Sequence, residues 1–167
     1  MSKERNATEN AYEEKIIKIN RVSKTVKGGR RISFAVMAAV GDENGSIGVG
    51  LGKANGVPEA IKKAFAKARK NLVKSSLSKT TIPHKVVGEF GATRVVMLPA
   101  TEGTGVIAGS AAREILELAG VHNVLTKIMG SKNKLNVARA TVEGLKLLRT
   151  PEQVATLRGK TVEEILG

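Results

Sequence analysis

Ile47-Gly-Val-Gly-Leu-Gly-Lys53 is the stretch of this sequence that decides its fold. Its apolar residues alternate with glycine, and this period of two predicts a β-strand with one face free of side chains. No G-x-G-x-x-G frame fits where the following helix is expected, and no G-K-[ST] follows the glycines there, so a nucleotide-binding loop is not favoured. We therefore predict that another part of the protein packs closely against the bare face of this strand.

The segments around this strand predict a small domain of three strands and a helix. Residues 14–27 and 32–40 carry strand-like apolar patterns, and the turn between the second and third strands contains Asn44-Gly45, a pair typical of hairpins. A helix is expected to open near Pro58, because proline is favoured in the first helical turn. Its apolar stripe has helical spacing and consists of Val57, Ile61, Ala64, Phe65, Ala68 and Leu72.

The Ser/Thr-rich residues 75–81 are the best candidate for a link to a second domain. Beyond it we expect strands at 82–90 and 93–99 and a loop at 100–105. A helix should follow that contains Gly109-Ser110, stops at Gly120 and carries the apolar residues Ile107, Ala111, Ile115 and Leu118. The last expected elements are a strand at 121–129 and a helix at 136–148 that Thr150-Pro151 breaks. The predicted fold is thus α+β, with a flexible N-terminal tail (1–11), a first domain (12–76), a second domain (77–150) and a C-terminal tail (151–167).

The net charge of the chain points to a polyanionic partner. It is +13 at pH 7, from 28 Lys and Arg against 15 Asp and Glu. A field of that sign favours nucleic acid first, and an anionic membrane or an acidic protein second. Residues 1–80 hold 17 of these cations against 7 acids, so the first half is the expected contact. Four aromatic residues are too few for recognition by base stacking, which leaves recognition of backbone and shape. The chain has no cysteine for a disulfide or thiolate metal site, and no apolar run of about eighteen residues that would predict a membrane span.

The most basic stretch is Arg21-Val-Ser-Lys-Thr-Val-Lys-Gly-Gly-Arg-Arg31, which carries five cations and no acid. Gly28-Gly29 at its expected tip permits a tight turn and a close approach to another surface. We interpret this stretch as a loop that contacts a densely negative partner. The alternative is a solvated basic hairpin that protects an edge strand from aggregation.

A second basic feature lies on the expected helix. Lys63, Lys67, Lys70 and Lys74 form a row roughly opposite its apolar stripe, and no acid follows Glu59 in it. Such a row can be a solubilising face, but solubility alone favours interspersed acids. Together the two basic features predict a two-part contact with phosphates. The predicted RNA-binding residues are Arg21, Ser23, Lys24, Lys27, Gly28, Gly29, Arg30, Arg31, Lys53, Lys63, Lys67, Lys70 and Lys74.

No catalytic or metal-binding pattern accompanies these features. His84 and His122 stand alone, without the partner spacing that acid–base or metal chemistry requires. Pro99-Ala-Thr-Glu-Gly-Thr-Gly105 is expected to open a helix and loosely resembles the phosphate loop of the galactokinase and homoserine kinase superfamily, but lacks the paired serines that follow it there. A small-molecule kinase-like protein that binds a nucleotide at Gly103–Gly105 is therefore the alternative function. We expect no enzyme activity, cofactor, metal or small-molecule substrate.

Three blocks of the sequence resemble the bacterial-type small ribosomal subunit protein five family. They are Asn20-Arg-Val-Ser-Lys-Thr-Val-Lys-Gly-Gly-Arg30, then Gly50-Leu-Gly-Lys-Ala54 with Val57-Pro-Glu-Ala-Ile61 and Lys67-Ala-Arg-Lys-Asn-Leu72, and finally Pro99 to Gly105 with Leu118-Ala-Gly-Val121, Gly130-Ser131 and Asn136-Val137. The ending, Arg158-Gly-Lys160 and Glu163-Glu-Ile-Leu-Gly167, is also similar to that of the family.

This resemblance implies a double-stranded-RNA-binding-like first domain and a β-α-β-type second domain with a left-handed crossover. It implies a non-enzymatic protein, cytoplasmic and ribosome-bound, that binds small-subunit ribosomal RNA where head meets body and touches small-subunit proteins four and eight. The family is associated with decoding accuracy, and its basic loop lies near the spectinomycin site. The second domain is expected to supply protein contacts. The third functional hypothesis is a free-standing double-stranded RNA-binding protein unrelated to ribosomes.

Overall fold

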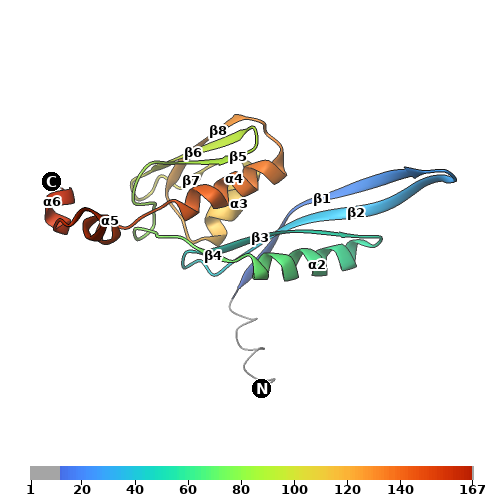
Figure 1. Cartoon of the computed structure of the whole chain (residues 1–167), viewed down its shortest axis with the longest axis horizontal. Helices are drawn as coiled ribbons and strands as arrows, with labels where there is room; N and C mark the ends of the chain where they lie inside the picture. Colours follow the sequence, from blue (N-terminus) through green and yellow to red (C-terminus); the bar gives the residue numbers. More distant parts are fainter. Residues whose placement is uncertain (1–11, 167) are drawn as a thin grey trace, which may run out of the picture.

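The computed structural model describes residues 12–166, and the predicted flexible tail at 1–11 lies outside this range. Two four-stranded sheets and their helices are stacked in four layers (Figure 1). The first sheet has the order β1-β2-β3-β4, and the second has the order β5-β6-β8-β7. The α+β class expected from the sequence is confirmed.

The first sheet lies between α2 on one face and α3 and α4 on the other (Figure 1). Its elements are β1 (Glu13–Val26), β2 (Gly29–Gly41), β3 (Ser46–Ala54), α2 (Val57–Lys70) and the short β4 (Val73–Lys74). Alternate β2 residues take opposite sides, as the strand period requires. Val36 and Ala38 pack with Ala60 and Ala64 of α2, whereas Met37 belongs to the core shared with the second domain.

The prediction that the glycine face of β3 is closely packed is confirmed, and α2 is the element that covers it. A Cβ on Gly48, Gly50 or Gly52 would fall on the carbonyl oxygen of Ala68, Ala64 or Ala60, respectively. Glycine on the strand and alanine at every fourth helix position therefore let the two backbones approach until no larger side chain fits.

The second sheet is covered on one face by α3 and α4. The remaining elements are β5 (Val86–Phe90), β6 (Thr93–Pro99), β7 (Val106–Ile107), α3 (Ser110–Leu118), β8 (Val124–Gly130), α4 (Lys134–Lys146), α5 (Pro151–Arg158) and α6 (Val162–Leu166). The strands β7 and β8 are parallel neighbours joined through α3, which forms the expected β-α-β unit. Both β5 and β8 pair with β6 in antiparallel fashion.

The turn between β2 and β3 joins the two halves of the molecule. The Glu43 N–H donates to the Leu118 carbonyl at 3.0 Å, and the Gly45 N–H donates to that of Ala119 at 2.9 Å. Gly120, at φ +87°, ends the helical region as predicted, and a Cβ there would collide with the Glu43 carbonyl. Lys15 and Glu117 add an ion pair at 3.1 Å across the same junction. The two halves thus share one large core, and a smaller separate cluster lies between β2 and α2.

Several predicted elements differ from those observed. The residues 82–85 are not part of a strand, and β5 begins at Val86. Ile107 fits the helical spacing but belongs to β7, because it pairs with Leu125 and the extended Gly109 separates it from α3. Gly109 therefore precedes the helix. A Cβ on Gly109 would collide with the Ile128 side chain of β8, so this glycine packs closely against a strand and not against a helix. β8 starts three residues later than expected, and α4 starts two residues earlier.

The predicted C-terminal tail contains two helices. Thr150 and Pro151 do more than end α4, because Thr150 forms a capping box with Gln153 and Pro151 occupies the first turn of α5. Gly159, at φ +62°, ends α5 in the left-handed conformation that glycine adopts without strain. This segment lies at the end of the molecule opposite the β1–β2 hairpin (Figure 1).

Asp42 organises the turn between β2 and β3. Its Oδ1 accepts hydrogen bonds from the backbone N–H groups of Asn44 at 2.9 Å and Ser46 at 2.8 Å. Burial raises the pKa of this carboxyl, but the hydrogen bonds from Ser46 and Asn44 outweigh burial, so the pKa of Asp42 lies below its ordinary value.

Replacing Asp42 should therefore destabilise the protein in a pH-dependent way. Because the pKa is lower in the folded state, the stabilisation is present above the unfolded pKa of about 4 and is lost as pH falls through the folded pKa. Asp42→Ala should lower the free energy of unfolding by about 1 kcal/mol at pH 7, with a smaller difference at pH 3, in urea denaturation. The neighbouring Glu43→Ala is the control, and a pH-independent effect of Asp42→Ala would contradict this account.

Candidate nucleic-acid interface

The basic stretch forms the far end of a long hairpin made by β1 and β2. The strands remain paired up to Val26 and Gly29, and the turn consists of Lys27 and Gly28. Gly29 has a φ of +130°, which a residue with a side chain rarely adopts. No atom lies within 4 Å of the Cβ position at either glycine, so the tip is open to a close approach. The hairpin extends beyond α2 and away from the second domain (Figure 1).

Cations project from both faces of this hairpin. In the register of the two strands, Arg21 lies opposite Phe34, Thr25 opposite Arg30, and Lys24 opposite Arg31. Because side chains alternate along a strand, Arg21 and Arg30 share the face of Phe34, whereas Lys24 and Arg31 share the other face. The hairpin can therefore contact phosphates on two sides at once.

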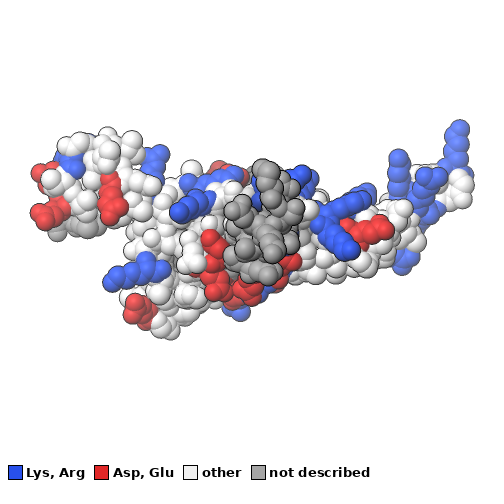
Figure 2. Space-filling view, turned by 90° about the horizontal axis from the view of Figure 1, so that it is seen from below, with Lys and Arg blue, Asp and Glu red and all other residues white. Residues whose placement is uncertain are grey.

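The charge of the hairpin is not compensated within the described part of the chain. No acid occurs between Lys15 and Gly41, and Arg21, Lys24, Lys27, Arg30 and Arg31 form no ion pair with any residue from 12 to 166. All five are exposed, as is Ser23. On the face seen in Figure 2, the end of the hairpin carries Lys and Arg with no Asp or Glu. Since β1 is an edge strand, edge protection also remains compatible with this arrangement.

The lysines predicted to form a row opposite the apolar stripe of the helix are placed differently in the structure. The buried stripe of α2 consists of Ala60, Ala64 and Ala68. Lys63 and Lys67 directly precede two of these alanines, and with about 100° of rotation per residue they lie on the flank of the helix, not opposite the stripe. The row also ends earlier than expected, because Lys74 belongs to β4.

The remaining predicted cations are exposed. Lys70 ends α2, and Lys53 lies on β3 opposite Ala35, on the side of the first sheet that faces the second domain. The neighbouring Arg69 instead bonds Glu14 of β1 at 2.7 Å.

The kinase-like loop does not open a helix. After Gly105 the chain enters β7, and α3 begins only at Ser110. The Gly105 N–H donates to the Asn123 side chain at 3.1 Å, which ties the loop to the start of β8. The free helix N-terminus that would bind a nucleotide phosphate is therefore not formed by Gly103–Gly105.

Burial raises the pKa of Glu114 in α3, and the positive charges of Lys134 and Lys15 oppose that rise. His84 is structural, because its Nε2 accepts a hydrogen bond from the Arg149 N–H at 3.2 Å. Between residues 12 and 166, no three His, Asp or Glu side chains gather as metal ligands, and no helix is long and apolar enough to cross a membrane.

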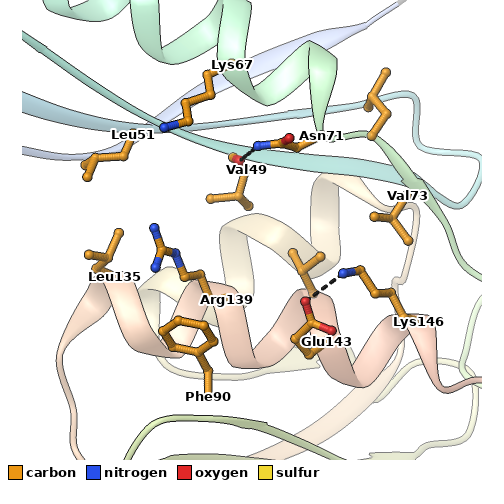
Figure 3. A pocket seen from close by; sticks show the side chains of 12 residues that line it. Val49, Leu51, Lys67, Asn71, Val73, Phe90, Leu135, Arg139, Glu143 and Lys146 are labelled. Carbon is orange, nitrogen blue, oxygen red and sulfur yellow. Dashed lines mark hydrogen bonds and ion pairs between the residues drawn. The ribbon is translucent and has the colours of Figure 1, made fainter.

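Sequence reasoning missed a cleft between the two domains, shown in Figure 3. Its walls come from α2 and β3 on one side and from α4 on the other. Of the predicted RNA-binding residues only Lys67 lines it, beside Arg139 of the second domain, which the sequence did not single out. The sequence gives no sign that Lys67 and Arg139 line one cleft, because the two cations are 72 positions apart on separate helices.

Comparisons with known proteins cover nearly the whole chain. Residues 12–74 match the family model described as ribosomal protein S5, N-terminal domain, and residues 88–158 match that of ribosomal protein S5, C-terminal domain. The small ribosomal subunit protein uS5 of Fusobacterium nucleatum subsp. nucleatum is 68% identical over 162 residues, which cover 97% of this chain and 99% of that protein.

Proposed function

The chain belongs to the ribosomal protein S5 family, and we propose that its first domain binds small-subunit ribosomal RNA through phosphate contacts of the β1–β2 hairpin and the cations near α2. As a member of this family it is a structural constituent of the small ribosomal subunit and not an enzyme, and it binds ribosomal RNA and ribosomal proteins.

The main support for this RNA site is the charge pattern of the β1–β2 hairpin. Its end presents cations on both faces, contains no acid, and forms no ion pair with residues of the described chain. A projection of this kind suits insertion between two phosphate backbones, because one strand pair presents charge to each side. Arg30 and Arg31 can bind phosphates with two hydrogen bonds each, so they should contribute most per charge. Gly28 and Gly29 allow the backbone itself to approach the RNA.

The family resemblance supports a more detailed proposal for the RNA site and the protein partners on the small subunit. The proposed RNA site lies where head meets body, with the hairpin near the spectinomycin site and an effect on decoding accuracy. The proposed protein partners are small-subunit proteins four and eight, and the ribosome-bound protein is cytoplasmic. We place the domain boundary between residues 76 and 77, which is supported by the gap between β4, ending at Lys74, and β5, starting at Val86.

Salt dependence of RNA binding tests the phosphate contacts. Each neutralised phosphate should contribute roughly −0.7 to −0.9 to the slope of log affinity against log salt concentration. Titrations of the full chain with small-subunit ribosomal RNA should therefore show affinity that falls steeply between low and physiological salt. Affinity that barely changes with salt would reject the proposal.

A further inference from the structure

The cleft between the domains has an apolar floor and a cationic rim. Its volume is about 460 Å³, within the range of sites that hold one small ligand group. Val49 and Leu51 of β3 form the floor on the first-domain side, and Leu135 and Val142 of α4 form it on the other.

Two cations enter this cleft from opposite walls. Figure 3 shows Lys67 extending from α2 and Arg139 from α4 into the space between them. Arg139 lies over the Phe90 ring, 5.0 Å from its centre, and this cation–π contact restrains the guanidinium. Neither cation forms an ion pair with residues 12–166.

The one acid among the lining residues is already neutralised. Glu143 accepts a hydrogen bond from Lys146 at 2.6 Å, one turn along the same helix (Figure 3). Lys67 and Arg139 therefore leave the lining of the cleft with an excess of positive charge. An anion in the cleft would be attracted from both walls.

We propose that this cleft binds a phosphate group of a nucleotide, with Lys67 and Arg139 as its two ligands from opposite domains. Arg139 supplies the planar pair of donors that matches phosphate oxygens, and Lys67 supplies a point charge. The apolar floor would accept the sugar or the face of the base. The inference rests on the proposed function, because it identifies the phosphate as part of the bound ribosomal RNA.

The consequence is that RNA contacts are not confined to the first domain. A nucleotide held by α2 and α4 together would bridge the domain junction, so RNA binding would restrain the angle between the domains. The second domain would then contribute an RNA contact in addition to the protein contacts expected of it.

The double variant Lys67→Ala with Arg139→Ala tests the site in the full chain. Affinity for small-subunit ribosomal RNA should fall at least about tenfold, and the log–log salt slope should become shallower by roughly 0.7 to 0.9, the value for one phosphate. The control is Lys85→Ala with Arg113→Ala, which removes the same charge types from exposed positions outside the cleft, the hairpin and α2. Equal affinity and slope in the two variants would overturn the proposal.

Two further measurements separate a lost ligand from a lost fold. Arg139→Lys keeps the charge and should recover part of the affinity that Arg139→Ala loses, whereas no recovery would indicate a packing role and overturn the site. The Arg139 Nε–H NMR signal should shift on addition of an RNA fragment. A shift with inorganic phosphate but not with RNA would assign the cleft to a free phosphate and equally overturn it.

The hairpin variant Lys27→Glu with Arg30→Glu distinguishes the cleft site from the proposed hairpin contacts. If it loses RNA binding while the cleft variant does not, only the cleft proposal fails. If neither variant changes binding, the proposed phosphate contacts fail as a whole.

Discussion

Reversing two charges at the hairpin tip, with Lys27→Glu and Arg30→Glu, is expected to weaken binding to small-subunit ribosomal RNA by at least about 100-fold. Each lost phosphate contact is a charge-assisted hydrogen bond worth about tenfold in affinity, and the new carboxylates add repulsion. Both residues are exposed and unpaired within the described chain, so the thermal unfolding midpoint should not change. Incorporation into small subunits, measured by sedimentation, should fall with the affinity.

The matched control reverses two charges at the other end of the molecule. Arg158→Glu with Lys160→Glu changes the net charge by the same amount on exposed residues of the C-terminal segment. If net charge alone drove RNA binding, both double variants would lose affinity equally. A location-specific contact predicts a much larger loss for the hairpin variant, and equal incorporation of hairpin variant and wild type would reject the RNA site.

Gly50→Ala is expected to destabilise the first domain by about 3 kcal/mol, although it adds a single methyl group. The new Cβ would overlap the Ala64 carbonyl oxygen and also crowd the backbone of Ala68, so α2 must move away from β3. Such overpacking commonly costs 1–3 kcal/mol, and here the obstructing atoms are backbone atoms that cannot rotate aside. Urea denaturation should show a lower midpoint.

The same substitution at the hairpin tip is the control for this prediction. Gly28→Ala meets no atom within 4 Å, so it should change the free energy of unfolding by less than about 0.5 kcal/mol. Similar midpoints for Gly50→Ala and Gly28→Ala would show that the helix does not need the bare face of β3. Because the other face of the first sheet packs into the core shared with the second domain, the loss at Gly50 should appear in the unfolding of the whole chain.

The elements that the sequence predicted well have strong local patterns. The strand-like alternation of β1, β2 and β3 and the helical spacing and Pro58 of α2 reproduce the observed elements to within a few residues. The boundaries of β6 match those observed. The basic hairpin is equally local, because its charges are contiguous in sequence.

The missed elements depend on distant partners. The two-residue strands β4 and β7 are too short for a period, and each exists because it pairs with β3 or β8. The helical spacing at Ile107 was misleading for the same reason, since strand pairing outweighed a weak periodic signal. The α5 helix was overlooked because Thr150-Pro151 was interpreted only as a stop, although the same pair also begins a helix.

The family, the α+β class, the uneven distribution of charge and the close packing on the β3 glycines could all be predicted from sequence, because contiguous residues encode each of them. Three features became visible only in three dimensions: alanines of α2 fill that glycine face, the helix lysines lie on a flank, and Lys67 and Arg139 line the same cleft. Local patterns fix which face of an element is apolar or charged. Which other face it meets depends on the packing of the whole chain, since contacts between distant segments leave no period in the sequence.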